Sequence, residues 1–163
     1  MCRPSSDLAR ALAAGQVDLA VVEQSVGVSA GECLCVERLV WVGAKAGAAH
    51  LRRPLPLSMV ADTCAFRPAV LATLGERDLA WRTVFENGSM EATVATVRAD
   101  LAVSAWLAST VPPDLDILPA GSGLPDLPNF AVSLHGPRHR IGAANELACY
   151  LRDGLVGHRH AVA

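Results

Sequence analysis

Residues 53–67 read RPLPLSMVADTCAFR and join a short apolar strand pattern to a polar turn that contains a cysteine. A helical pattern begins directly after this turn, at Arg67. The turn therefore falls at the carboxyl end of a predicted strand and at the amino end of a predicted helix. Open α/β sheets hold small ligands at this position, where free N–H groups of the helix terminus face the ligand. The stretch predicts an α/β fold with a ligand site at the turn.

Two more turns have the same helix-opening character. Ser5-Ser6-Asp7 precedes a predicted helix over residues 7–14, and Glu86-Asn87-Gly88-Ser89 precedes one over residues 89–99. A serine hydroxyl accepts hydrogen bonds from the free N–H groups of a helix start, and Asn and Gly suit turns with positive φ. These turns are candidates for ligand contact, although helix capping and turn chemistry alone also explain them.

Strand and helix patterns alternate along the chain, with a loop expected over residues 24–36. The strand patterns are short and mostly apolar, which is typical of strands buried on both faces of a parallel sheet. The alternation predicts an α/β class with largely parallel sheets. The expected strands cover residues 17–22, 38–44, 55–60, 81–86, 101–103, 115–118 and 130–134, and the expected helices cover 7–14, 67–77, 89–99 and 142–155.

Two segments rich in residues that break helices and strands bracket the middle of the chain, near 45–54 and 119–129. Such segments are typical of linkers between compact parts. The pattern predicts two lobes joined by two crossover segments. Residues 1–50 and 128–163 would form lobe one, and residues 51–127 would form lobe two.

Composition narrows the function classes. The chain has 163 residues, of which 52% are hydrophobic and 18% charged, so it can bury a core. The 14 basic and 16 acidic residues are mixed, which argues against direct nucleic-acid binding by this segment. We find neither a signal peptide nor an apolar run long enough to span a membrane. Five cysteines without a signal peptide indicate reduced thiols and a cytoplasmic location.

Several short segments together carry a family resemblance. In chain order they are LAAGQVDLAV at 12–21, LVWV at 39–42, RPLPL at 53–57, CAFR at 64–67, VRADLAV at 97–103, STVP at 109–112 and LPDLP at 124–128. In this order and spacing, over residues 8–155, the chain resembles the C-terminal effector-binding domain of LysR-type transcriptional regulators.

The resemblance implies a periplasmic-binding-protein-like fold, with two Rossmann-like lobes and a ligand cleft between them. It also implies a small-molecule effector that acts on a homo-oligomer, a dimer or a tetramer, bound to DNA. Nothing in the sequence resembles the family's DNA-binding helix-turn-helix. The family's first strand, helix and second strand, which precede the position of Ser5, are absent too. We therefore expect lobe one to be incomplete, with an exposed apolar edge at strand 17–22.

A further departure from the family is Asp100, where a glycine is usual. If this turn requires positive φ, an aspartate is tolerated there at some cost in free energy.

The resemblance also places candidate ligand contacts. Arg67 could pair with an anionic effector, and Phe66 could stack on it. Cys64 could instead be a redox-sensing thiol, but the paired cysteines of the family's peroxide sensors are missing. Trp106 is more typical of packing than of recognition. The full set of candidate ligand-binding residues is Ser5, Ser6, Cys64, Phe66, Arg67, Asn87, Gly88, Ser89, Ser104 and Trp106.

Other chemistry lacks support in the sequence. Cys33 and Cys35 have no partner ligands at zinc-site spacing. A G-x-S-x-G elbow, a G-x-G-x-x-G loop and a Walker loop are all missing. We therefore expect no metal, cofactor or catalytic residue. The sequence is interpreted as a ligand-sensing regulatory domain and not an enzyme. The alternatives are a solute-binding protein or an enzyme on the same fold, or a non-functional fragment of a regulator.

Overall fold

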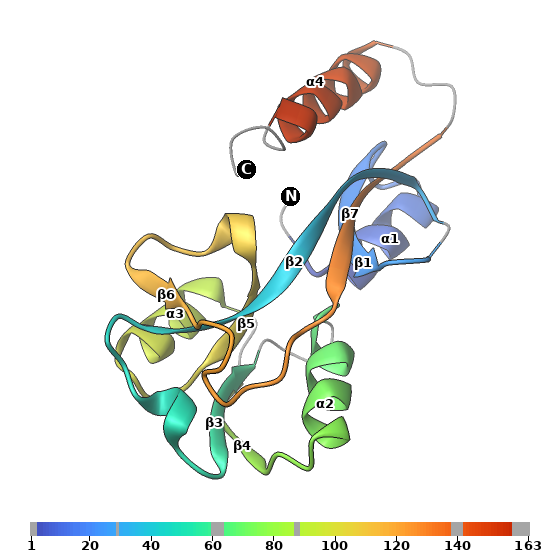
Figure 1. The fold of residues 1–163 in the computed structure, drawn as a ribbon. Coiled ribbons are helices and arrows are strands. Elements are labelled where there is room, and N and C mark those ends of the chain that lie inside the picture. Colours follow the sequence, from blue (N-terminus) through green and yellow to red (C-terminus); the bar gives the residue numbers. More distant parts are fainter. Residues whose placement is uncertain (1–2, 29, 60–63, 87–88, 138–141, 158–163) are drawn as a thin grey trace. The chain divides into compact units, whose positions relative to one another are not determined.

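The structure is a computed structural model that describes residues 3–28, 30–59, 64–86, 89–137 and 142–157 (Figure 1). Helices and strands alternate, as the sequence predicts. In chain order the elements are α1 (Ser5–Ala13), β1 (Ala20–Ser25), β2 (Glu32–Ala44), the 3-10 helix η1 (Ala49–Leu51), β3 (Leu55–Met59), α2 (Arg67–Glu76), β4 (Trp81–Glu86), α3 (Met90–Arg98), β5 (Ser104–Leu107), the 3-10 helix η2 (Ala108–Thr110), β6 (Leu115–Ile117), β7 (Asn129–His135) and α4 (Ala143–Gly157).

The chain forms two compact units. Unit 1 contains residues 1–37 and 129–163, and unit 2 contains residues 38–128. The lobe limits expected from the sequence, after residues 50 and 127, stay a prediction. Each described helix is too short or too polar to cross a lipid bilayer.

Unit 1 is built on an antiparallel pair of strands. β1 pairs with β7 in a register that runs from Ala20 opposite His135 to Ser25 opposite Phe130. A cluster of Leu34, Leu134 and Ala148 brings β2, β7 and α4 together in the core. Arg152 of α4 also pairs with Glu32 of β2, with 2.6 Å between Nε and Oε1. That hydrogen bond raises the pKa of the Arg152 guanidinium above its ordinary value.

The start of α1 differs from its prediction. Pro4 is the N-cap and its carbonyl accepts from the N–H groups of Asp7 and Leu8, so Ser5 already belongs to the helix. The Ser5 hydroxyl instead donates to the Glu23 carboxylate and accepts from the Glu23 N–H, at 3.1 Å between nitrogen and oxygen. The prediction of a serine cap was wrong because the helix begins two residues earlier than its apolar pattern suggests.

Strand β1 lies at the end of its sheet. In the part of the chain that the structure describes, the strand order is β1-β7-β2-β5, so β1 has β7 as its one neighbour. On the edge of β1 that faces away from β7, the Glu23 N–H donates to the Ser5 hydroxyl, so one backbone group of this unpaired edge has a partner.

Unit 2 contains both antiparallel and parallel pairs. β5 and β6 pair with β2 antiparallel, while β3 and β4 pair in parallel. Together with the antiparallel β1–β7 pair, this arrangement shows that the expectation of largely parallel sheets was wrong. Short apolar runs indicate that a strand is buried on both faces, but they carry no information on its direction.

Two further boundaries differ from the prediction. The expected loop over 24–36 contains the start of β2, because Gly27 and Gly31 turn the chain with φ of 98° and 78° before Glu32. The expected strand over 101–103 is reduced to a parallel bridge between Val103 and Leu57, and β5 follows it.

Asp100 adopts a left-handed conformation, with φ of 53°, so the turn does have the positive φ that the sequence analysis considered. Its carboxylate accepts from the Ala49 N–H at 2.9 Å and pairs with Arg52 at 2.8 Å. A second Arg52 nitrogen donates to the Asp100 carbonyl at 2.8 Å. Aspartate tolerates positive φ better than most residues. Its side chain also makes two contacts that a glycine could not make, as an acceptor for the Ala49 N–H of η1 and as a charge partner for Arg52.

Candidate functional site

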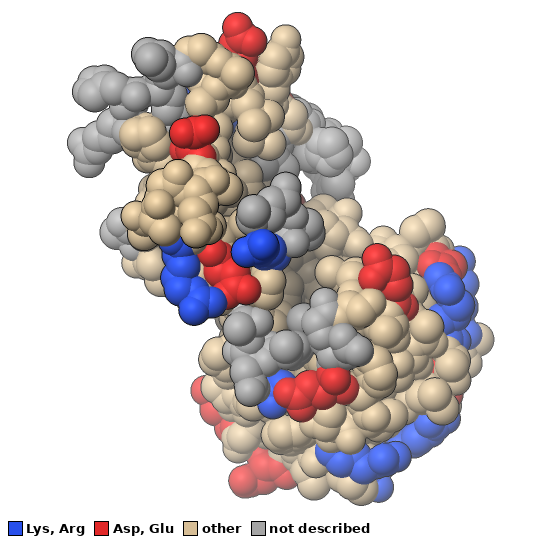
Figure 2. Space-filling model, turned by 180° about the vertical axis from the view of Figure 1, so that it is seen from behind, with Lys and Arg blue, Asp and Glu red and all other residues tan. Residues whose placement is uncertain are grey.

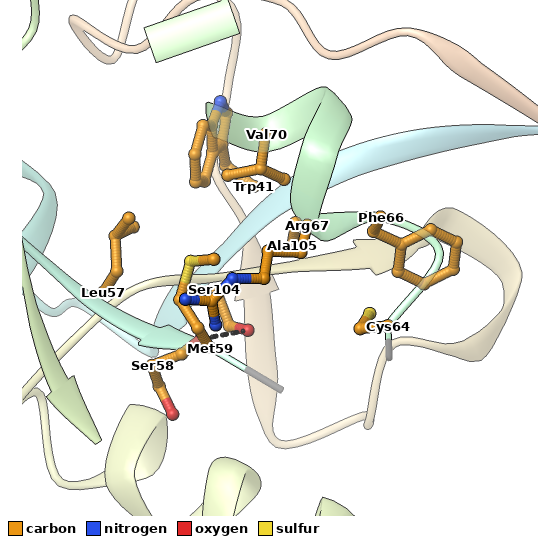
Figure 3. A pocket seen from close by; sticks show the side chains of 10 residues that line it. All are labelled: Trp41, Leu57, Ser58, Met59, Cys64, Phe66, Arg67, Val70, Ser104 and Ala105. Atoms are coloured by element: carbon orange, nitrogen blue, oxygen red, sulfur yellow. Dashed lines mark hydrogen bonds between the residues drawn. The ribbon is translucent and has the colours of Figure 1, made fainter. Parts of the chain in front are cut away.

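A hollow of about 320 Å³, which includes space open to solvent, lies in unit 2 at the turn between β3 and α2. Figure 3 shows its lining, which comes from β2, β3, the turn, α2 and β5. The lining residues are Trp41, Leu57, Ser58, Met59, Cys64, Phe66, Arg67, Val70, Ser104 and Ala105.

One wall of this pocket follows from strand pairing. Trp41 of β2 lies directly opposite Ala105 of β5, and directly opposed residues point to the same face of a sheet. The small alanine leaves space beside the indole. The indole N–H of Trp41 donates to the carbonyl of Pro125 at 2.7 Å, which fixes the ring. Trp41 is therefore a rigid wall of the pocket.

Arg67 supplies the positive charge of the pocket. It is the first residue of α2, and in Figure 3 its side chain extends from that helix toward β3. Its Nη1 lies 2.7 Å from Oε1 of Glu86 at the end of β4. The Arg67 side chain is 18% exposed and that of Glu86 is 40% exposed. The guanidinium is thus mostly buried and already paired with a carboxylate.

The remaining walls are mostly apolar, with some polar groups. Met59, Phe66 and Val70 contribute hydrophobic surface, and Cys64 contributes a half-buried thiol. The Ser104 hydroxyl donates to the Ser58 carbonyl at 2.9 Å. Among the described residues the buried Ser58 hydroxyl finds no partner, and Figure 3 shows it directed away from Arg67.

Four of the predicted site residues lie together in this pocket: Cys64, Phe66, Arg67 and Ser104. Trp106 lies elsewhere, in a core cluster with Val42, Val97 and Leu115. Ser5 and Ser6 belong to unit 1. Asn87 and Gly88 lie outside the described residues.

Ser89 is the N-cap of α3. Its hydroxyl accepts from the Ala92 N–H at 3.3 Å and donates to the Glu91 carboxylate at 2.8 Å. The pKa of Glu91 is lowered, first by a hydrogen bond from its own backbone N–H and second by the Ser89 hydroxyl. Capping, which the sequence indicated as one use of Ser89, is confirmed.

Sequence reasoning missed six lining residues. Three of them, Leu57, Ser58 and Met59, lie within the stretch that the sequence analysis singled out, and the alternation of Leu57 and Met59 in the strand was the available signal. Trp41 and Ala105 become neighbours through a pairing of distant strands, which no local pattern reveals. The sixth is Val70 of α2.

Charges on the surface are mixed. On the face drawn in Figure 2, basic and acidic side chains are interspersed over both units. Within the described ranges, no three His, Cys, Asp or Glu side chains gather closely enough to hold a metal ion. The pocket thus remains the strongest candidate site.

Comparison with known proteins decides the family. The family model described as the LysR substrate binding domain matches residues 2–153. The chain belongs to this family. Residues 2–153 are therefore a LysR substrate-binding domain, and the family predicted from the sequence is confirmed.

Solved structures of LysR-type regulators share this fold. The regulatory domain of HypT from Salmonella typhimurium in its apo form is 16% identical, with a TM-score of 0.72 over 99% of this chain and 82% of that one. The effector binding domain of QuiR in complex with shikimate is 15% identical, with a TM-score of 0.68 over 96% and 80%.

Full-length HypT from the same organism matches with a TM-score of 0.73 and 14% identity. The match covers 96% of this chain and 58% of full-length HypT. At such low identity these structures show the fold alone, which is the periplasmic-binding-protein-like α/β fold of LysR substrate-binding domains. The predicted fold class is confirmed.

Proposed function

We propose that the pocket between β3 and α2 binds the small-molecule effector of a LysR-type transcriptional regulator. The observation that carries this proposal is the lining itself, which combines apolar walls with Arg67 at the start of α2. Binding sites for small molecules are typically concave and largely apolar, with a few polar groups that orient the ligand. Related domains support the proposal, since the QuiR domain is bound to shikimate and the CcmR domain of Synechocystis PCC6803 to 2-PG.

The proposed role is regulation and not catalysis. Among the described lining residues, the ionisable side chains are Cys64 and Arg67. An arginine keeps its proton at all relevant pH values and cannot serve as a general base. A pocket with this lining is suited to binding, so the alternative of an enzyme loses support.

An effector would act by shifting a conformational equilibrium. A ligand moves a protein between two states only by the difference in its affinity for them. We propose that this shift acts within a homo-oligomer and that DNA contact belongs to a helix-turn-helix. DarR from Vibrio fischeri, which has the same fold, has been solved in complex with DNA. We further propose a cytoplasmic location, because a regulator of promoters acts where the DNA is.

A thermal-melt screen tests the proposal. The screen would use small organic acids, amino acids, sugar acids and phosphorylated metabolites against the wild-type chain and two leucine variants. Ala105→Leu fills the pocket beside Trp41, while Ala72→Leu adds the same volume at an exposed position of α2. A ligand present at about 100 times its Kd stabilises the folded protein by about 2.7 kcal/mol.

We expect at least one compound to raise the Tm of the wild type and of Ala72→Leu, and to leave the Tm of Ala105→Leu unchanged. Equal stabilisation of all three proteins would place binding outside this pocket and contradict the proposal.

A further inference from the structure

The chain leaves unit 2 through residues 119–128, which lie between β6 and β7 and are drawn in orange without helix or strand in Figure 1. We call this stretch the return segment, and unit 1 begins directly after it, at Asn129. None of its residues is buried. Gly121 and Gly123 have φ of 87° and 84°, a conformation that glycine adopts at no steric cost. The position of the return segment therefore depends on its contacts with the rest of unit 2.

Two side chains from elsewhere in the described part of the chain donate hydrogen bonds to the return segment. The indole N–H of Trp41 donates to the Pro125 carbonyl at 2.7 Å. Arg53 Nη2 lies 3.5 Å from the Gly123 carbonyl, and Nη1 of the same side chain donates to two other carbonyls at 2.9 and 2.8 Å. The bond from Trp41 is the shorter of the two, so it is the stronger tether.

The same indole is a wall of the pocket. Trp41 is 5% exposed, lies directly opposite Ala105 and lines the pocket together with it. In Figure 3 the indole nitrogen lies on the side of the ring away from Met59 and Ser104, which also line the pocket. A hydrogen bond weakens steeply as its angle departs from linear. A displacement of the ring from the pocket side therefore weakens its bond to the return segment.

We infer that Trp41 couples the pocket to the return segment: an occupant that displaces the indole breaks its hydrogen bond to Pro125 and loosens the segment that leads into unit 1. This inference rests on the proposed function of the pocket and supplies its regulatory step. The two states differ in whether the indole is bonded or released, and a ligand that fits only beside the displaced ring prefers the released state.

Backbone ¹⁵N relaxation of Trp41→Phe tests the tether without any ligand. The variant keeps an aromatic ring in the wall and removes the N–H donor. We expect the order parameters of the backbone amides in residues 121–127 to fall from about 0.85, typical of rigid backbone, to about 0.6 or below. The Leu118 amide donates to the Trp41 carbonyl at 2.9 Å and should stay rigid, because that bond needs no indole. Trp106→Phe makes the same change in the core and should leave the return segment unchanged.

Ala105→Leu tests the link from the pocket to the tether, since the larger side chain takes the space beside the indole as an occupant would. We expect the Trp41 indole N–H to exchange with solvent about two- to tenfold faster than in the wild type, the factor that corresponds to one hydrogen bond. The order parameters of the return segment should fall as in Trp41→Phe. Ala105→Val should act in the same direction with a smaller effect, and Ala72→Leu, at an exposed position of α2, should have none.

Three results would overturn the inference: return-segment order parameters in Trp41→Phe equal to those of the wild type, an equal loss in Trp106→Phe, or indole exchange in the Ala105 variants that is unchanged or slower. The Trp41→Phe and Ala105→Val measurements decide the matter if Ala105→Leu does not fold. Because no ligand is used, a melt screen without a stabilising compound would contradict the effector pocket and leave the tether standing. Unchanged indole exchange would contradict the coupling and leave the pocket standing.

Discussion

The two faces of the β2–β5 pair carry one tryptophan each and use them differently. Trp41 lies opposite Ala105 and lines the pocket, while Trp106 lies opposite Val40 and packs into the core. The two tryptophans belong to adjacent residue pairs along β2 and β5, and adjacent pairs point to opposite faces of a sheet. A change of one residue in the strand register would therefore exchange the pocket side chain and the core side chain. A tryptophan near a predicted site can therefore be assigned to it only when the strand pairing is known.

The largest expected effect is on the core face. Trp106→Ala removes a buried ring from the cluster with Val42, Val97 and Leu115 and should lower the free energy of unfolding by about 3–5 kcal/mol. Urea unfolding followed by circular dichroism measures the loss. Trp81→Ala, at a ring that is 37% exposed, is the control and should cost less. An equal cost for the two variants would contradict the assignment of Trp106 to the core.

A change at Trp41, on the pocket face, should affect effector binding more than it affects the stability of the fold. Trp41→Phe removes the hydrogen bond to Pro125 and should lower the free energy of unfolding by about 0.5–1.5 kcal/mol. Because the ring lines the pocket, the same change should weaken any effector found in the melt screen. Titration calorimetry of this variant beside Trp106→Phe measures both effects. If Trp41→Phe kept its effector affinity while Trp106→Phe lost affinity, Trp106 and not Trp41 would be the tryptophan of the binding site.

Val97 of helix α3 packs in the same core cluster as Trp106. The N-cap of α3 should therefore affect stability and not ligand binding. Ser89→Ala removes the acceptor for the Ala92 N–H and should cost about 1 kcal/mol. Ser6→Ala, at an exposed serine of α1, should change stability by less than about 0.5 kcal/mol. A loss of effector affinity in Ser89→Ala at unchanged stability would assign this serine to the pocket.

The smallest expected effect is a pH dependence of the same helix start. The pKa of Glu91 is below its ordinary value of 4.5, so its contribution to stability is present above pH 4.5 and declines as pH falls through the lowered value. The effect is small because the carboxylate is exposed. Thermal melts should show that Glu91→Gln is less stable than the wild type at pH 7 and that the difference shrinks below pH 4.5. A difference that grows on acidification would contradict the direction of the shift.

Local patterns predicted much of the fold. The strand over 81–86 agrees with β4, and the predicted serine cap of α3 is present, because hydrophobic alternation and capping depend on neighbouring residues. Asp100, which replaces the glycine usual in the family pattern, has a positive φ, and the sequence left this conformation open. The turn between β3 and α2 was identified from its own sequence, and three of its candidate residues line the pocket.

What sequence could not predict depends on partners far along the chain. Ser5 bonds to Glu23, Trp41 lies opposite Ala105, and Glu86 pairs with Arg67. Each of these contacts decides whether a polar or aromatic side chain is available to a ligand. A residue type at a helix start thus identifies a candidate, and its hydrogen-bond partners in the fold determine its use.

The indole N–H resonances of the three tryptophans test the pocket most directly. The measurement is a ¹⁵N-correlated NMR titration with the compound that raises Tm most in the melt screen, with signals assigned through Trp41→Phe, Trp81→Phe and Trp106→Phe. If the effector binds between β3 and α2, the Trp41 signal shifts with the same Kd as calorimetry and moves more than the other two. If the compound binds while the Trp41 signal stays in place, the effector site is not this pocket.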